Sequence, residues 1–270
     1  MKKSKRILAL LGAVILLAVF CLPMITAFGS GENANGIFVA SIFAVFFVAV
    51  MAYLIMLVYR VIDKRKTPDG PVKNIIFDVG NVLLKYDWES YLAGYHFEQE
   101  KYERIADAVF RSKTWVERDR GDLTEQEYVE QMVAADPEDE KEIREIMKNC
   151  KGTTSSLDYA ATWTAYLKKQ GYRLYVLSNY CDYMRNETIK DMTFLKNMDG
   201  VVFSCDVHMI KPEAEIYRYV LNTYGLDAKE TVFIDDRKEN CEGAEKEGIH
   251  AIVFTSFKQA AAELEQLGVK

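Results

Sequence analysis

Two long uncharged apolar runs constrain this chain more than any other feature of its sequence. Residues 7–26 and residues 37–59 contain no Asp, Glu, Lys or Arg. A helix needs about 20 apolar residues to cross roughly 30 Å of hydrocarbon, and the core helices of globular proteins rarely stay apolar all round for that length. The sequence therefore predicts two transmembrane helices, which form a hairpin within residues 1–62.

The first run has a second interpretation. Basic residues precede it, and the small residues Ala27 and Gly29 follow it, which is also typical of a cleaved signal peptide. The run is long for the apolar part of a signal peptide, and the second run follows after a short gap. We therefore favour two membrane spans.

Charge predicts the orientation of the hairpin. The loop 29–36 between the runs has no Lys or Arg, whereas basic residues flank the outer ends of both runs: Lys2, Lys3, Lys5, Arg6, Arg60, Lys64, Arg65 and Lys66. Loops rich in Lys and Arg stay in the cytoplasm, so we expect a multi-pass protein of the cell membrane whose C-terminal domain is cytoplasmic. The lipid bilayer is then a partner. Residues 67–270 carry a net charge of −12, which makes nucleic acid a poor partner.

A polar linker at residues 63–73 separates the apolar runs from a pattern of strands and helices. Five short runs are almost continuously hydrophobic, as expected of parallel strands buried on both faces: residues 74–77, 173–177, 200–204, 231–234 and 251–255. Helical stretches separate most of them. The alternation predicts an α/β fold with a doubly wound parallel sheet, made by residues 74–88 and 155–270.

Residues 89–154 interrupt this alternation with helical sequence only. Thr124 and Glu127 have the spacing of a capping box, and Pro137 starts a further helical stretch. The insertion is too long for a simple connection, so we expect a helical cap that closes over the site. Its aromatic residues are expected to pack the core of the cap: Trp88, Tyr91, Tyr95 and Phe97.

Polar residues that carry chemistry follow the predicted strands. Open α/β sheets bind their ligands at the carboxyl ends of the strands. The residues at these ends, with one lysine at a helix start, are Asp78, Ser178, Asn179, Lys211, Asp235 and Asp236. We therefore expect a carboxylate nucleophile, a hydroxyl, an ammonium group and an acidic pair to meet at one edge of the sheet.

This set, in this order, resembles the haloacid dehalogenase superfamily over residues 74–256. The opening FDVGNV at residues 77–82 and the ending FIDDRKENCEGA at residues 233–244 are similar to the capped phosphatase branch that includes bacterial glucose-1-phosphate phosphatases. The resemblance implies a Rossmann-like core and a phosphomonoester hydrolase. Its substrate would be a small phosphorylated metabolite such as a sugar phosphate.

The resemblance also implies roles for single residues. Asp78 attacks phosphorus and forms an aspartyl-phosphate, and Mg²⁺, which prefers oxygen ligands, offsets the repulsion between two anions. The implied Mg²⁺ ligands are Asp78, the carbonyl of Gly80, and Asp236. Asp235 and Asn240 would support this set without binding the metal. The implied contacts to the phosphorylated substrate are Gly80, Asn81, Ser178, Asn179 and Lys211.

One position departs from the usual phosphatase pattern. Gly80 stands where most phosphatases of the superfamily have a second Asp that acts as general acid and base. Three readings follow: another group or a water replaces it, the aspartyl-phosphate hydrolyses slowly, or the domain is a degraded, membrane-anchored sensor. Asp87 is a candidate replacement, but its position favours an N-cap. A dehalogenase also lacks the second Asp, yet it uses no Mg²⁺ and would be disfavoured by Asp235 and Asp236.

The remaining polar residues have weaker signals. Arg118 and Arg120 either contact an anionic substrate or form ion pairs with Glu117 and Asp119. The three histidines lack ligand spacing and are expected to be structural or surface residues: His96, His208 and His250. The five cysteines form no CxxC pair, and most are expected to be buried free thiols.

Overall fold

The computed structural model describes Tyr53 and residues 70–270. The chain divides into two compact units, Met1–Lys66 and Thr67–Lys270. Apart from Tyr53, the predicted membrane spans 7–26 and 37–59 lie outside the described residues. Within the described part, none of the helices combines the length and apolarity that crossing a bilayer requires. The hairpin therefore stays a prediction.

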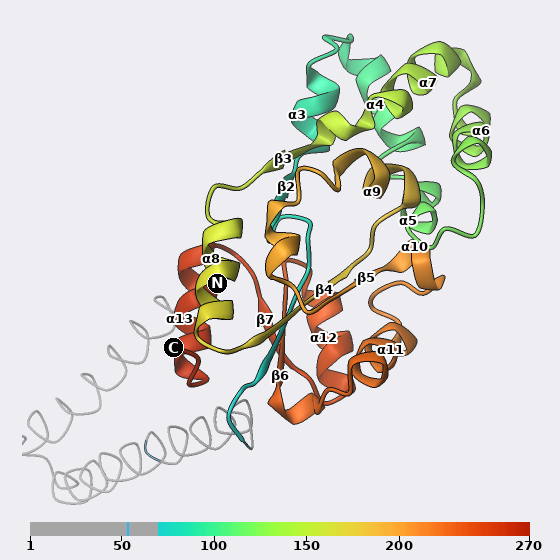
Figure 1. Ribbon diagram of the computed structural model, residues 1–270. Coiled ribbons are helices and arrows are strands. Elements are labelled where there is room, and N and C mark those ends of the chain that lie inside the picture. Colours follow the sequence, from blue (N-terminus) through green and yellow to red (C-terminus); the bar gives the residue numbers. More distant parts are fainter. Residues whose placement is uncertain (1–52, 54–69) are drawn as a thin grey trace, which may run out of the picture. The chain divides into compact units, whose positions relative to one another are not determined.

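The second unit is built on a five-stranded sheet, as the sequence predicts (Figure 1). All its strand pairs are parallel, in the order β5-β4-β1-β6-β7. The bounds are β1 Asn74–Phe77, β4 Arg173–Ser178, β5 Gly200–Phe203, β6 Thr231–Asp235 and β7 His250–Val253. Phe77 pairs with Val176 on one side and Ile234 on the other. The carboxyl ends of β1, β4 and β6 therefore lie together.

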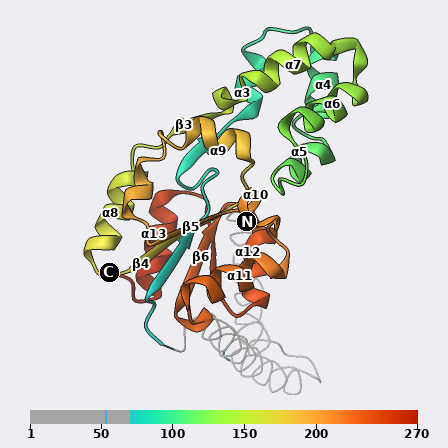
Figure 2. The ribbon, with the colours of Figure 1, turned by 45° about the vertical axis from the view of Figure 1, so that its right-hand side comes forward.

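Helices cover both faces of this sheet (Figures 1 and 2). Ile75 and Phe77 point to the face covered by α8 (Ala160–Lys169) and α13 (Phe257–Gln266). Ile76 points to the opposite face, which is covered by α11 (Ala214–Tyr224) and α12 (Lys238–Lys246). Successive residues of a strand point to opposite faces, so β1 is buried on both sides. The prediction of a doubly wound α/β core is confirmed.

Some predicted strand ends differ from the structure. Ser178 is the last residue of β4, and Ser204 begins the one-turn helix α10 (Ser204–Val207) instead of ending β5. The Ser204 hydroxyl accepts a hydrogen bond from Tyr180 N, which holds the chain beside the end of β4. The other short helices of the core are α9 (Asp182–Thr188) and the 3₁₀ helices Thr193–Asn197 and Ala228–Glu230.

The insertion after β1 forms a helical cap with a hydrophobic core of its own. Its helices are α3 Trp88–Ala93, α4 Gln99–Ala108, α5 Lys113–Arg118, α6 Glu125–Ala135 and α7 Glu140–Lys148, with 3₁₀ helices at Pro137–Asp139 and Cys150–Thr153. The predicted capping box of Thr124 and Glu127 is present at the start of α6. The four aromatic residues predicted to pack this cap lie against its core.

A two-stranded ribbon joins the cap to the sheet. β2 (Leu84–Tyr86) and β3 (Thr154–Ser156) pair antiparallel, and the cap helices lie between them in the chain (Figure 1). This ribbon was not predicted from the sequence, because each strand has three residues and only Leu84 is buried. The four cysteines in the described part are buried free thiols, as predicted: Cys150, Cys181, Cys205 and Cys241.

Candidate active site

A buried lysine lies between two carboxylates at the end of β1. Lys211 Nζ is 2.8 Å from Asp78 Oδ1 and 2.6 Å from Asp235 Oδ2. Burial raises the pKa of Asp78 to about 6, against the opposing effect of Lys211. Burial alone would lower the pKa of Lys211, but Asp235 and Asp78 outweigh it and raise that pKa. The lysine therefore stays charged beside the predicted nucleophile.

Asp236 completes an acidic cluster with Asp78 and Asp235. Oxygen atoms of these three carboxylates all lie within 4.8 Å of one another. Asp235 is fully buried and already accepts hydrogen bonds from Lys211, from the backbone of Arg237 and from Asn240 Nδ2. Its role is thus to hold Lys211 and the start of α12.

The other two carboxylates fit a divalent cation. Asp236 is partly exposed and accepts a hydrogen bond from Asn81 Nδ2 at 2.9 Å. Burial and the neighbouring charge of Asp235 raise the pKa of Asp236, so a bound cation would relieve crowded negative charge. Hard oxygen donors of this kind suit Mg²⁺. Asp78, Asp236 and the carbonyl of Gly80 are the residues that would hold it.

Ser178 and the two predicted asparagines surround this cluster. Ser178 is 1% exposed, and it lies close enough to Asp78 to lower the pKa of that carboxyl. Asn179 accepts from Lys211 N at 2.8 Å and donates to Lys211 O at 3.0 Å. Asn81 donates to Asp236 and accepts from Tyr86 N at 3.0 Å. Both asparagines line the cavity described below, and their side chains fix the positions of Lys211, Asp236 and the ribbon.

Space is free beside Gly80, where most phosphatases of the superfamily have the second Asp. A Cβ built on Gly80 would meet only Asp78 Oδ2 within 4 Å, at 3.8 Å. Asp87 does not fill this place, because its side chain caps α3 by accepting from Ser90 N and pairs with Lys85. The N-cap interpretation of Asp87 is confirmed.

The two arginines predicted as anion contacts are both engaged in ion pairs. Arg118 is 1% exposed, binds Glu125 through two nitrogen atoms, and lies over the ring of Trp115. Arg120 binds Glu213 through two nitrogen atoms, at 2.9 and 2.6 Å, and also contacts Glu117. The ion-pair interpretation is confirmed, with Glu117 as one partner of Arg120, but the partners Glu125 and Glu213 were not predicted.

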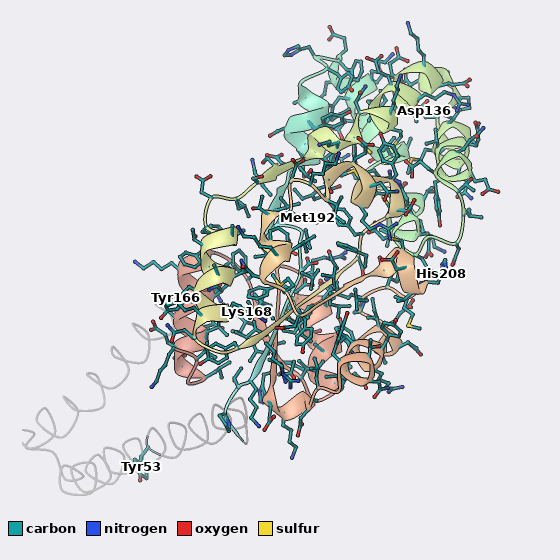
Figure 3. The ribbon with its side chains drawn as sticks, viewed as in Figure 1. Tyr53, Asp136, Tyr166, Lys168, Met192 and His208 are labelled. Carbon is teal, nitrogen blue, oxygen red and sulfur yellow. The ribbon has the colours of Figure 1, made fainter. Side chains whose placement is uncertain are left out.

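The histidines stay structural. His208, labelled on the right-hand side of Figure 3, ends α10 with a left-handed backbone (φ 56°) and lies 3.3 Å from Asp122. His96 occupies a turn with φ 55°, and His250 begins β7.

A cavity of about 310 Å³ lies over these groups. The core lines it with the acidic cluster's Asp78 and Asp236, and with Ser178 and Lys211. The cap and ribbon line it with four aromatic residues, which we call the aromatic wall: Tyr86, Trp88, Phe110 and Trp115.

The rings of the aromatic wall contact one another in a row. Ring centroids are 6.4 Å apart for Tyr86 and Trp115, 4.9 Å for Phe110 and Trp115, and 5.0 Å for Trp88 and Phe110. This wall was not predicted. Trp88 was predicted to pack the cap, but nothing in the sequence brings these four side chains to one cavity.

The part of the chain that matches a known protein family contains most of the core and all of the cap. A family model described as haloacid dehalogenase-like hydrolase matches residues 72–248. The chain belongs to this family of hydrolases. The match runs from just before β1 to just before β7, and so includes every predicted site residue.

Named relatives of this hydrolase include a phosphatase and other enzymes. A sesquiterpene phosphatase of Aspergillus oryzae is 25% identical over 198 residues, which is 72% of this chain and 96% of that protein. Bifunctional epoxide hydrolase 2 of Rattus norvegicus is 33% identical over 107 residues, 38% of this chain and 19% of that protein. This chain thus matches about a fifth of the epoxide hydrolase.

Solved structures share the fold of this hydrolase. A haloacid dehalogenase family enzyme of Bacteroides thetaiotaomicron, in complex with magnesium and inorganic phosphate, superposes with a TM-score of 0.56 at 24% identity. The superposition covers 70% of this chain and 98% of that one. A dehalogenase superposes with a TM-score of 0.53 at 20% identity, covering 67% and 83%.

Proposed function

We propose that this hydrolase is a Mg²⁺-dependent phosphomonoesterase that acts through an aspartyl-phosphate at Asp78. The observation that carries the proposal is the buried Lys211 between Asp78 and Asp235, with Asp236 beside them at the floor of a cavity. One carboxylate is free to attack, and a fixed ammonium group neutralises charge near the phosphoryl group. A phosphatase among the relatives, and a relative of this fold in complex with magnesium and phosphate, support the proposal.

Each core residue has a defined task in this reaction. Lys211 keeps Asp78 ionised and oriented, and Ser178 is placed to donate a hydrogen bond to a phosphoryl oxygen. Mg²⁺ held by Asp78, the Gly80 carbonyl and Asp236 would supply the remaining positive charge. Asp235 and Asn179 keep Lys211 in place.

The aromatic wall indicates the kind of leaving group that the cavity can hold. Sugar hydroxyls need hydrogen-bond partners, and the one arginine of the cap that lines the cavity, Arg118, is already paired with Glu125. Ring faces instead bury apolar groups well. We therefore propose that the leaving group is an apolar alcohol, such as a long alkyl or isoprenoid chain, and not a sugar. The name of the Aspergillus oryzae relative is in line with this.

Phosphate release by the whole 270-residue chain tests both parts of the proposal. We expect turnover of n-alkyl phosphates with Mg²⁺ and none with EDTA. Because burying one methylene stabilises a complex by about 0.8 kcal/mol, kcat/KM should rise about fourfold per added methylene until the cavity is filled. Glucose 1-phosphate should react more slowly than octyl phosphate.

A matched pair of variants tests the wall itself. Trp115→Ala should reduce the ratio of kcat/KM for octyl phosphate to kcat/KM for methyl phosphate. Tyr166→Ala removes an exposed aromatic side chain on α8, visible in Figure 3, and should leave the ratio unchanged. A flat series with chain length would contradict the apolar leaving group. Release of chloride from 2-chloropropionate without Mg²⁺ would contradict the phosphatase, and binding without any turnover would favour a sensor.

We also propose that this domain is anchored in the cell membrane and faces the cytoplasm. The proposal rests on the apolar runs 7–26 and 37–59 and on the basic residues at their outer ends. An apolar substrate that partitions into lipid would suit an enzyme held at a bilayer. The chain should remain with membranes after an alkaline carbonate wash, and its release by that wash would contradict the anchor.

A further inference from the structure

The reaction proposed above needs a proton donor that Gly80 does not supply. An alkoxide is a poor leaving group unless it is protonated as the bond to phosphorus breaks. The later attack of water on the aspartyl-phosphate needs a group that removes a proton. A side chain for both steps must therefore reach the cavity from another part of the chain.

Asp119 reaches this cavity from the cap. It directly follows α5 and lines the same cavity as Asp78, Ser178 and Lys211. No other carboxylate of the cap lines that cavity among the described residues. Its carboxylate makes no salt bridge with either neighbouring arginine in the described part of the chain, because Arg118 binds Glu125 and Arg120 binds Glu213. The carboxyl group is thus left to face the cavity.

Three contacts hold the loop of Asp119 against the core. The Ser204 hydroxyl donates a hydrogen bond to the backbone carbonyl of Asp119. Arg120 binds Glu213, 93 residues away in the chain and two residues after Lys211. Gly121 has φ +75°, and a Cβ there would lie 3.0 Å from Cys205 Cβ, so the loop packs tightly on α10. The position of Asp119 over the site is therefore fixed by the fold.

The charges around Asp119 suit a group that exchanges protons near neutral pH. Burial raises its pKa, Asp78 raises it further, and the net value is about 7. Three cations oppose this shift: Arg118 beside it, Lys211 below it and Arg237 at the start of α12. Bound Mg²⁺ would lower the value. Both protonation states are thus accessible, as general acid–base catalysis requires.

We propose that Asp119 replaces the missing second Asp as the general acid and base of this site. In the first step an oxygen of Asp78 bonds to phosphorus, the bond to the leaving oxygen breaks, and the Asp119 carboxyl gives its proton to that oxygen. In the second step the Asp119 carboxylate takes a proton from water, the water oxygen bonds to phosphorus, and the bond to Asp78 breaks. The products are an alcohol and inorganic phosphate, with Asp78 and the proton on Asp119 restored. This assignment rests on the proposed phosphatase activity.

Leaving groups of different basicity test the assignment in Asp119→Asn. With octyl phosphate, which needs a proton on its leaving oxygen, kcat/KM should fall about 10²- to 10⁴-fold. With p-nitrophenyl phosphate, whose leaving group departs as an anion, kcat/KM should fall far less. Since hydrolysis of the intermediate is also slowed, a burst of p-nitrophenolate and a phosphorylated protein in acid-quenched mass spectra are expected. The ratio of the two substrates does not depend on the folded fraction.

Two further variants sharpen the test. Asp122→Asn, in the same loop but exposed and away from the cavity, is the matched control and should behave as the parent. Adding Gly80→Asp to Asp119→Asn should raise kcat/KM for octyl phosphate at least tenfold above that of Asp119→Asn alone, because a side chain at residue 80 has room beside Asp78.

A pH profile gives an independent readout. For octyl phosphate, kcat/KM should fall as Asp119 loses its proton with rising pH, and this limb should vanish in Asp119→Asn. Equal losses on both substrates without a burst would overturn the assignment and leave Asp119 a structural residue. Failure of the parent chain to release phosphate with Mg²⁺ would instead overturn the proposed function.

Discussion

Asp78→Asn is expected to lower kcat/KM for every phosphomonoester by at least about 10⁴-fold, the scale of loss when a nucleophile is removed. An amide has nearly the shape of the carboxylate, so Lys211 and Ser178 keep their places, but its nitrogen and oxygen carry no charge for the attack. Acid-quenched mass spectrometry of the parent chain during turnover should show one phosphoryl group on the peptide that contains Asp78. The variant should show none.

The control for this variant is a charge-matched change elsewhere in the core. Asp158→Asn removes an exposed carboxylate just before α8 and should retain the parent's activity. The proposed role of Asp78 would be contradicted if Asp78→Asn kept more than about a hundredth of the parent's kcat/KM. Phosphorylation of a different peptide would contradict it as well.

Lys211→Met is expected to destabilise the metal-free protein by about 3–5 kcal/mol, in addition to losing activity. The ammonium group is 1% exposed and binds both Asp78 and Asp235. Its removal leaves two buried carboxylates without a cation. For a unit of this size, a loss of 1 kcal/mol corresponds to a fall of about 2–4 °C in Tm. A thermal melt of Lys211→Met should therefore show a fall of roughly 6–20 °C.

The loss of stability in Lys211→Met should depend on pH, because the pKa of Asp78 is raised in the folded state. Asp78 already has a pKa of about 6, above its ordinary value, and removing Lys211 raises that pKa further. A carboxyl whose pKa is raised in the folded state destabilises the fold while it is ionised, so the deficit of Lys211→Met should be largest above the folded pKa. It should shrink as pH falls through that value, because the folded state then takes up a proton.

The control is Lys168→Met, which removes a lysine on the exposed side of α8, labelled in Figure 3. Its partner Asp199 is also partly exposed, and such pairs contribute about 0–1 kcal/mol. A similar loss of stability in the two variants would mean that the buried position of Lys211 carries no special weight.

The core and the grouping of its polar residues at one edge of the sheet were predictable from the sequence for a simple physical reason. Parallel strands buried on both faces leave continuous apolar runs, and the polar residue that ends each run lies at the same edge of the sheet. Asp78, Ser178 and the pair Asp235 and Asp236 follow directly from this rule. Lys211 was placed only by its order relative to the others, and the structure brings it between Asp78 and Asp235.

The cap's share of the site was not predictable in the same way. The sequence favoured ion pairs of Arg118 and Arg120 with Glu117 and Asp119, because these residues are neighbours in the chain. Arg118 binds Glu125 instead, because helix α6 directs that carboxylate toward it. The aromatic wall and the contact between Arg120 and Glu213 also join residues far apart in the sequence. No periodicity encodes such contacts, because they depend on how the ribbon of β2 and β3 sets the cap on the core.

The ribbon of β2 and β3 separates the two parts of the chain that contribute residues to the site. The proposed nucleophile Asp78 and its partner Lys211 belong to the core, while the aromatic wall and Asp119 belong to β2 and the cap beyond it. Both connections between the two bodies run through one pair of short strands. An exchange of the cap helices at this junction during evolution can therefore change which substrates the site accepts, while Asp78 and Lys211 stay unchanged.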